Sequence, residues 1–125
     1  MIKKFLPFFV LITLLTTTAT AQNNSLKGKW KDNQGIGYEM EFFEDGKGKI
    51  GGGGEFLPME YTVDFTKDPA WIDLTILPPG EPKKKVRGLI NFVDEDTFIA
   101  EINSEERPTK IDALSLDYLN MVRSK

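Results

Sequence analysis

Residues 59–76 read MEYTVDFTKDPAWIDLTI, and this stretch decides the fold of the chain. Apolar side chains occupy alternate positions on both sides of the polar segment 67–70, which is the period of β-strands with one buried face. A four-residue turn at 67–70 predicts a hairpin with three apolar pairs: Phe65 with Ile72, Val63 with Leu74 and Tyr61 with Ile76. A shift of one residue would move each apolar set to the other face, so we expect this register to be firm.

A second hairpin is predicted just upstream. Residues 36–44 alternate in the same way and are followed by Glu44-Asp45-Gly46, a turn with glycine at the position that needs a positive φ. This turn places Met40 opposite Ile50 and Glu41 opposite Lys49. The hairpin would therefore have an apolar pair on one face and a charge pair on the other.

Short alternating segments separated by turn residues continue to the end of the chain. We expect about eight strands, near Trp30 and at 36–44, 47–52, 59–65, 71–77, 84–93, 97–103 and 118–123. Every connection is short, which favours sequential antiparallel pairing, and closure of the meander removes exposed sheet edges. The prediction is an all-β protein, a small up-and-down barrel. Residues 111–114 are compatible with a short helical turn, but a closing strand at 118–123 is favoured.

The N-terminus has the pattern of a secretory signal peptide. Lys3-Lys4 precede an apolar run at 5–15, and Ala19-Thr20-Ala21 supplies the small residues of a cleavage site. The run is too short to span about 30 Å of hydrocarbon, so a retained anchor is the weaker alternative. We expect a signal peptide at 1–21, a single domain at 22–125, and a secreted or periplasmic protein.

Composition restricts the function classes. The chain has no Cys and no His, which excludes disulfides, a thiol nucleophile and Cys-based metal sites. Removing Lys3 and Lys4 with the leader leaves 14 basic and 19 acidic residues, a net charge of −5, which disfavours nucleic acid. Carboxylates, Lys, Tyr and Ser remain, and none forms a recognisable catalytic constellation. We expect no enzyme activity, no cofactor, and no membrane contact after cleavage.

Several motifs occur in a recognisable order: Leu26-Lys27-Gly28-Lys29-Trp30, then residues 67–75 (KDPAWIDLT), then Arg107-Pro108-Thr109. This order resembles the small exported bacterial lipocalin-like domains of unknown function, with their pattern L-x-G-x-W, K-x-P-x-x-I-D-L-T and R-P-T. The resemblance covers nearly the whole chain after the leader. It implies a lipocalin-like barrel in which Trp30 lies at the closed end and Arg123, from the last strand, packs over it in a cation–π contact.

Two aspartates are the sharpest oddity in the predicted hairpin. Its register places Asp64 directly opposite Asp73 on the outer face, where like charges destabilise a sheet unless they are neutralised. A metal ion or a shared proton would neutralise them. A basic residue from the next strand would do so equally well, and Lys85 and Arg87 are available. We favour the basic partner over a metal site.

Three further segments are interpreted as loops or turns. Residues 51–54 are four glycines without the Gly-Lys-Ser/Thr ending of a phosphate loop, so a flexible loop or bulged edge is expected. Asp94-Glu95-Asp96 lacks the ligand spacing of a calcium loop and is expected to be a turn. Lys83-Lys84-Lys85 follows a proline-rich loop; solvated lysines are expected, with an anionic polymer or lipid headgroup as the alternative partner.

Two hypotheses for function remain. The first is a small apolar ligand bound in or at the mouth of the barrel, since eight strands enclose packed side chains or one small ligand. The candidate lining residues are Tyr38, Met40, Phe42, Tyr61, Val63, Leu74, Ile76, Ile90, Phe92 and Phe98. The second is an interaction or structural module of the cell envelope with a filled barrel. Leu89, Ile99 and Trp71 are predicted to face outward, and a contiguous apolar patch there would mark a protein partner.

Overall fold

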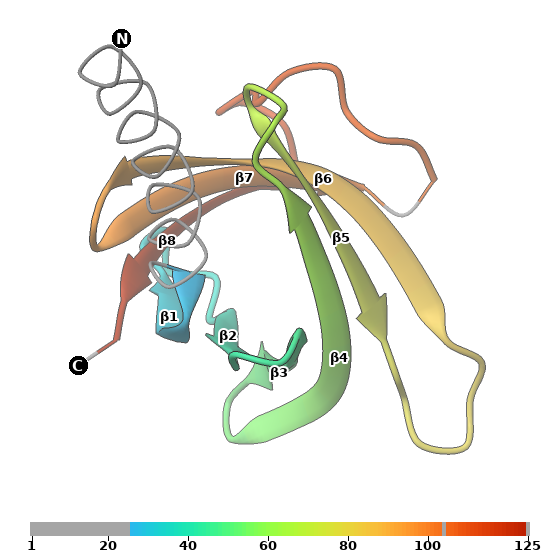
Figure 1. Ribbon diagram of the computed structural model, residues 1–125. Coiled ribbons are helices and arrows are strands. Elements are labelled where there is room, and N and C mark those ends of the chain that lie inside the picture. Colours follow the sequence, from blue (N-terminus) through green and yellow to red (C-terminus); the bar gives the residue numbers. More distant parts are fainter. Residues whose placement is uncertain (1–25, 104, 125) are drawn as a thin grey trace, which may run out of the picture.

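The computed structural model describes residues 26–103 and 105–124, which form eight antiparallel strands closed into one barrel (Figure 1). The strands are β1 (Gly28–Asp32), β2 (Glu39–Phe42), β3 (Lys47–Gly52), β4 (Glu55–Asp64), β5 (Ala70–Ile76), β6 (Lys84–Asp94), β7 (Thr97–Asn103) and β8 (Tyr118–Arg123). Each strand pairs with its sequence neighbours, and β8 pairs with β1. The all-β up-and-down barrel is confirmed. The predicted leader and residues 22–25 lie outside the described residues.

The strands alternate in direction, so their connections gather at two ends of the barrel. One end holds the approach to β1 at Leu26 and the connections 43–46, 65–69 and 95–96; we call it the closed end. The other holds the connections 33–38, 53–54 and 77–83 and the link from β7 to β8; we call it the open end.

The inner face carries the core, as the alternation predicts. Phe92 pairs with Phe98 and Ile90 with Ala100 across β6 and β7, with apolar side chains on one face. The core side chains that are at most 2% exposed are Leu26, Trp30, Met40, Phe42, Met59, Ile72, Leu74, Ile90, Phe98, Ala100 and Met121. Within the described residues, no polar or charged residue is buried. The core is therefore entirely apolar.

The β2–β3 hairpin has the predicted register. Met40 lies opposite Ile50, and Glu41 lies opposite Lys49, whose Nζ is 3.6 Å from the Glu41 carboxylate. Gly46 has a φ of 79°, as the turn requires. The strand itself is shorter than predicted, because β2 starts at Glu39 and leaves Ile36 and Tyr38 in the preceding connection.

The predicted register of the β4–β5 hairpin is wrong by two residues. The observed pairs are Met59 with Ile76, Tyr61 with Leu74 and Val63 with Ile72. The connection is longer than the four residues expected: Phe65 and Thr66 belong to it, and the Asp64 carboxylate accepts the Thr66 N–H at 2.9 Å. A shift of two residues keeps every apolar side chain on the inner face, so the alternation is satisfied in both registers.

The remaining connections are partly as predicted. Gly51 and Gly52 belong to β3, and Gly53-Gly54 form a tight two-residue turn with φ of 64° and 85°, which replaces the expected flexible loop. Two successive positive φ values are characteristic of a type I′ hairpin, and glycine adopts them without strain. The turn at residues 95–96 and the closing strand β8 are confirmed, and the 111–114 segment forms turns before β8.

Candidate functional site

Aromatic rings fill the barrel near its closed end. The Trp30 and Phe98 ring centroids are 4.7 Å apart and meet edge to face, and Phe42 meets Tyr61 in the same way at 4.9 Å. Phe92 lies 6.2 Å from Phe98 and 6.4 Å from Trp30. Such offset and edge-to-face contacts are the preferred arrangements of buried rings. This half of the interior is therefore packed core.

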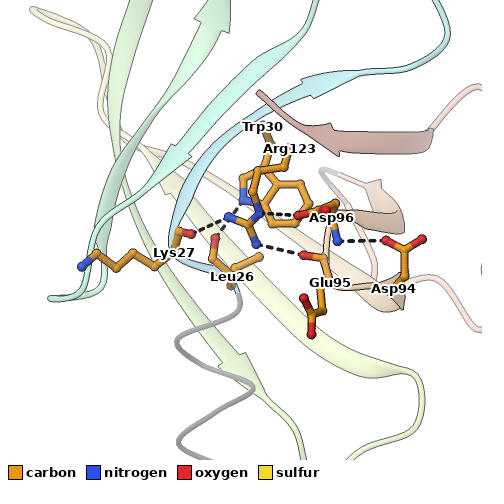
Figure 2. Close-up of polar contacts among 7 residues, drawn as sticks. All are labelled: Leu26, Lys27, Trp30, Asp94, Glu95, Asp96 and Arg123. Carbon is orange, nitrogen blue, oxygen red and sulfur yellow. Dashed lines mark hydrogen bonds and ion pairs between the residues drawn. The ribbon is translucent and has the colours of Figure 1, made fainter. Parts of the chain in front are cut away.

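Arg123 covers the closed end, as Figure 2 shows. Its guanidinium lies 4.3 Å from the centroid of the Trp30 ring, so the predicted cation–π contact is present. The same group donates hydrogen bonds to the carbonyls of Lys27 (2.9 Å) and Glu95 (3.0 Å) and to the Asp96 carboxylate (3.1 Å). Trp30 donates its indole N–H to the Leu26 carbonyl at 2.8 Å. Arg123 thus ties β8 to the start of β1 and to the β6–β7 turn.

The glycine two residues before Trp30, Gly28, leaves room for the Arg123 side chain. Its φ is 124°, and a Cβ built there would lie 2.8 Å from Nη1 of Arg123. A side chain at this position would occupy the place of the guanidinium. The Gly-x-Trp spacing is therefore required by the packing of Arg123 over Trp30.

The open end has a pocket of about 330 Å³ instead of packed rings. Its lining is mostly aliphatic and comes from six strands and two connections. The residues are Ile36, Tyr38, Met40, Ile50, Leu74, Ile76, Lys84, Val86, Ile102, Leu116, Asp117, Tyr118 and Leu119. Among the described residues that line it, only Lys84 and Asp117 are charged. A concave, mostly apolar pocket with a few polar groups has the character of a small-molecule site.

The connection 33–38 presents two apolar side chains at this mouth. Ile36 is 56% exposed and Tyr38 is 47% exposed. The Asp32 carboxylate, at the end of β1, accepts the backbone N–H groups of Gln34 (2.9 Å), Ile36 (2.8 Å) and Gly37 (2.6 Å). One carboxylate therefore fixes the shape of the loop that carries Ile36 and Tyr38.

The charge state of Asp32 follows from these bonds. Desolvation acts to raise its pKa, but the N–H groups of Ile36, Gln34 and Gly37 together outweigh it and hold the pKa below the ordinary value of 3.8. Tyr61, at the closed end, shifts the other way. Burial and the nearby Asp45 charge raise its pKa, and its hydroxyl donates to the Phe43 carbonyl.

The ten predicted lining residues divide between the two ends. Tyr38, Met40, Leu74 and Ile76 line the mouth pocket. Phe42, Ile90 and Phe98 are buried core, and Tyr61, Val63 and Phe92 are partly buried against it. The list of candidate residues omitted part of the lining. Ile50, Val86 and Ile102 follow the same inner-face period as the predicted residues, whereas Leu116 lies in a connection that no period marks.

Asp64 and Asp73 do not form the predicted pair. Because of the two-residue shift, Asp73 lies opposite Thr62, and Asp64 lies opposite Trp71. Thr66 donates its hydroxyl and its backbone N–H to Asp64 and, helped by Lys67, lowers the pKa of that carboxyl. Arg107, rather than Lys85 or Arg87, pairs with Asp73 at 2.7 Å. The two carboxylates therefore do not form a shared metal site, since each has its own partner.

Two of the sequence motifs, residues 67–75 and Arg107-Pro108-Thr109, meet on the outer wall. Arg107 donates to Asp73 and to the Gly88 carbonyl (2.9 Å), and its guanidinium lies 4.3 Å from the Trp71 ring centroid. Lys67 lies 4.9 Å from the same ring. These contacts hold the link between β7 and β8 against β5 and β6, and Figure 1 shows that link as an arch outside the barrel.

The link between β7 and β8, which we call the arch, covers part of the outer wall where an apolar patch was predicted. Leu89 faces outward as predicted but is only 3% exposed, in keeping with the crossing of the arch at Gly88. Trp71 is 40% exposed and contacts two cations, and Ile99 is half-buried. These three residues form no bare apolar surface on the outer wall.

Comparisons with protein-family models, with curated proteins and with solved structures give no match. Over residues 26–103 and 105–124, no three acidic side chains gather as a metal site. Within the same part of the chain, no helix has the length and apolar character needed to cross a membrane.

Proposed function

We propose that this protein is an exported, non-catalytic lipocalin-like barrel that binds a small apolar ligand at its open end. The observation that carries the proposal is the pocket of about 330 Å³ at that end, with its aliphatic lining and its half-exposed Ile36 and Tyr38. Large apolar side chains at a concave opening gain free energy when a ligand removes them from water.

The unequal filling of the barrel favours a ligand site at the mouth over one that extends through the whole interior. Phe42, Phe98 and Trp30 occupy the closed end, so the ligand would enter only as far as Met40 and Leu74. These two side chains form both the top of the core and the floor of the pocket. The ligand is therefore small and apolar over most of its surface, with Lys84 and Asp117 near any polar group that it carries.

The test is titration with a neutral fluorophore, N-phenylnaphthylamine, whose emission rises in an apolar site. In Ile76→Trp, a larger side chain enters the pocket from β5, and we expect the affinity to fall about tenfold or more. Thr75→Trp is the matched control, because the adjacent residue faces the outer wall of the same strand. Both variants should unfold at nearly the same temperature as the parent chain.

Two results would contradict the proposal: no emission change with the parent chain, or equal affinities for Ile76→Trp and Thr75→Trp. Native mass spectrometry of protein purified from its host adds an independent readout. A co-purified small molecule supports ligand binding. A co-purified protein without a small molecule favours the alternative, an interaction or structural module of the envelope.

A further inference from the structure

Leu116 differs from the other aliphatic side chains that line the mouth pocket. Met40 and Leu74, on the pocket floor, are at most 2% exposed, and Val86 is 8% exposed. Leu116 lines the same pocket and is fully exposed. An apolar side chain held in water gains free energy when an apolar surface covers it, and a ligand in the adjoining pocket would supply that surface.

The arch is fixed to β7 on both sides of a four-residue segment, 113–116, which we call the flap. Before the flap, the backbone N–H of Asp112 donates to the Glu101 carboxylate at 2.7 Å. After it, Asp117 accepts a backbone N–H of β7 at its carbonyl (3.2 Å) and the side-chain amide of Asn103 at its carboxylate (3.1 Å). The flap that carries Leu116 therefore lies between two anchors on the same strand.

Between these anchors the flap is held by local bonds. Leu114 donates its N–H to the Asp112 carboxylate, and Ser115 donates its N–H to the Asp112 carbonyl, both at 3.0 Å. The Ser115 hydroxyl and carbonyl accept the N–H groups of Asp117 (3.1 Å) and Tyr118 (3.3 Å). Within the described chain, every hydrogen bond of the flap stays inside the flap and the two residues on either side. The flap can thus pivot without breaking a hydrogen bond to the barrel, and segments that cover ligands are drawn from such locally held parts of a protein.

A ligand in the mouth pocket needs a cover on its outer side. Sites for small molecules bury about 70–90% of the ligand surface. A ligand that rests on Met40 and Leu74 at the end of the barrel has its opposite side toward water. The Asp32 carboxylate fixes the backbone of the loop that carries Ile36 and Tyr38, whereas the flap has no bond of this kind to the barrel. The flap is therefore the part of the pocket wall best suited to close.

We infer that the flap closes over the bound ligand and places Leu116 on its outer side, so that Leu116 determines how long the ligand stays bound. The inference rests on the proposed function, since it concerns the same pocket and the same apolar ligand. It adds a moving part: the ligand leaves only when the flap opens, as in other sites closed by a loop. Leu114 is 94% exposed and does not line the pocket, so it takes no part in this contact.

The test compares the two leucines of the flap, with N-phenylnaphthylamine as the probe. Leu116→Ser should raise the dissociation rate of the probe about fivefold to tenfold and weaken its affinity by a similar factor, because a buried leucine contact is lost. Stopped-flow dilution measures the rate. Leu114→Ser is the matched control, since it makes the same change at an equally exposed position and should leave the rate and the affinity unchanged. Both variants should unfold at the temperature of the parent chain, because neither side chain is buried.

Hydrogen exchange followed by NMR distinguishes a closing flap from a fixed wall. Bound probe should slow exchange of the Leu114 and Ser115 N–H groups at least fivefold, because the closed flap opens less often. The Thr66 N–H is the matched control, since a nearby carboxylate, that of Asp64, accepts it in the same way at the closed end. Its exchange should not change. Leu116→Ser should remove the protection of the flap, and Leu114→Ser should retain the protection of Ser115.

Two results would overturn the flap while leaving the pocket intact. One is an equal dissociation rate for the two serine variants. The other is unchanged exchange of the Leu114 and Ser115 N–H groups in the parent chain with probe bound, which would make Leu116 a fixed part of the wall. In both cases the parent chain has bound the probe, so the proposed function stands. A parent chain that gives no emission change with the probe removes the proposed function and the flap together.

Discussion

The two ends of this barrel arise from one alternating pattern yet have opposite properties. At the closed end, Trp30, Phe42 and Phe98 are 1% exposed, and the Phe98 ring centroid lies 4.7 Å from that of Trp30 and 6.5 Å from that of Phe42. At the open end, aliphatic side chains line a pocket of about 330 Å³, and Ile36 and Tyr38 are about half exposed. Alternation therefore determines which side chains face inward, while their size determines whether the barrel is filled.

The connections reinforce the difference. Arg123 draws three chain segments together at the closed end: its guanidinium contacts the Trp30 ring, the carbonyls of Lys27 and Glu95, and the Asp96 carboxylate. At the open end, the Asp32 carboxylate orders a single loop through the backbone of that loop. Closure of one end thus depends on long-range contacts, whereas the mouth is shaped by local ones. Substitutions at the closed end should mainly affect stability, and those at the mouth should mainly affect binding.

The largest expected effect is that of Trp30→Ala. Removing this fully buried ring deletes its contacts with Phe98 and Phe92 and the surface that Arg123 covers. The free energy of unfolding should fall by about 3–5 kcal/mol, a large part of the stability of a small domain. Denaturant unfolding followed by far-ultraviolet circular dichroism measures the change.

The open-end counterpart is Tyr38→Ala, which removes a half-exposed ring that lies in a connection. It should cost less than about 1 kcal/mol in stability and should weaken fluorophore binding instead. Equal losses of stability for the two alanine variants would show that the ends do not differ as proposed.

Most of the fold was predictable because the alternation is strong. It identified all eight strands, and the Met40–Ile50 and Glu41–Lys49 pairs follow from one turn of known type. It did not determine the β4–β5 register. Val63 keeps the same face and an apolar partner whether it pairs with Leu74, as predicted, or with Ile72, as observed. The length of the connection decided this register. It depends on Asp64 and Thr66, whose side chains form a local turn that no period reveals.

The mouth was less predictable than the core. Met40, Leu74 and Ile76 could be assigned to it because they belong to periodic strands. Leu116 could not, because it lies in the connection between β7 and β8, which no period marks, and it reaches the pocket only when the barrel closes. Arg107 was recognisable as part of a motif, but its partner Asp73 was assigned to Lys85 or Arg87, since sequence distance alone does not show that the arch returns to β5.

The next largest effect is expected for Gly28→Ala. A methyl group would lie 2.8 Å from the Arg123 guanidinium, on a backbone with a φ of 124°. Displacing Arg123 and adopting this strained conformation should together lower the free energy of unfolding by about 2–3 kcal/mol. The matched control at the open end is Gly35→Ala, where φ is 77° and nothing lies within 4 Å of the new Cβ.

Gly35→Ala should cost only about 1 kcal/mol, the strain of a left-handed alanine without a collision. The difference between the two glycine variants measures the crowding around Arg123. Adding Arg123→Ala to each variant sharpens the comparison. The double variant with Gly28→Ala should lose much less than the sum of its parts, while the one with Gly35→Ala should be additive. Additivity in both would show that Gly28 does not make room for Arg123.

The smallest expected effect, Asp32→Asn, should act on the mouth. An amide has one acceptor oxygen in place of two charged ones, so the bonds to the N–H groups of Ile36, Gln34 and Gly37 weaken. At neutral pH, stability should fall by about 1 kcal/mol, because the loop is exposed to water. Since folding lowers the Asp32 pKa, its contribution is present above the unfolded pKa and disappears as pH falls through the folded one. The parent and variant should therefore begin to converge below about pH 4 and should become equal only below the folded pKa.

The matched control for the loop is Asp64→Asn at the closed end, where a carboxylate also accepts a backbone N–H and has a lowered pKa. Both variants lose a local turn, but only Asp32→Asn loosens the loop that presents Ile36 and Tyr38 to the pocket. Asp32→Asn should therefore lower fluorophore affinity by about threefold to tenfold at pH 7, and Asp64→Asn should leave it unchanged. Equal affinities would mean that the mouth tolerates a mobile 33–38 loop, so that ligand binding would depend on the strand residues of the pocket alone.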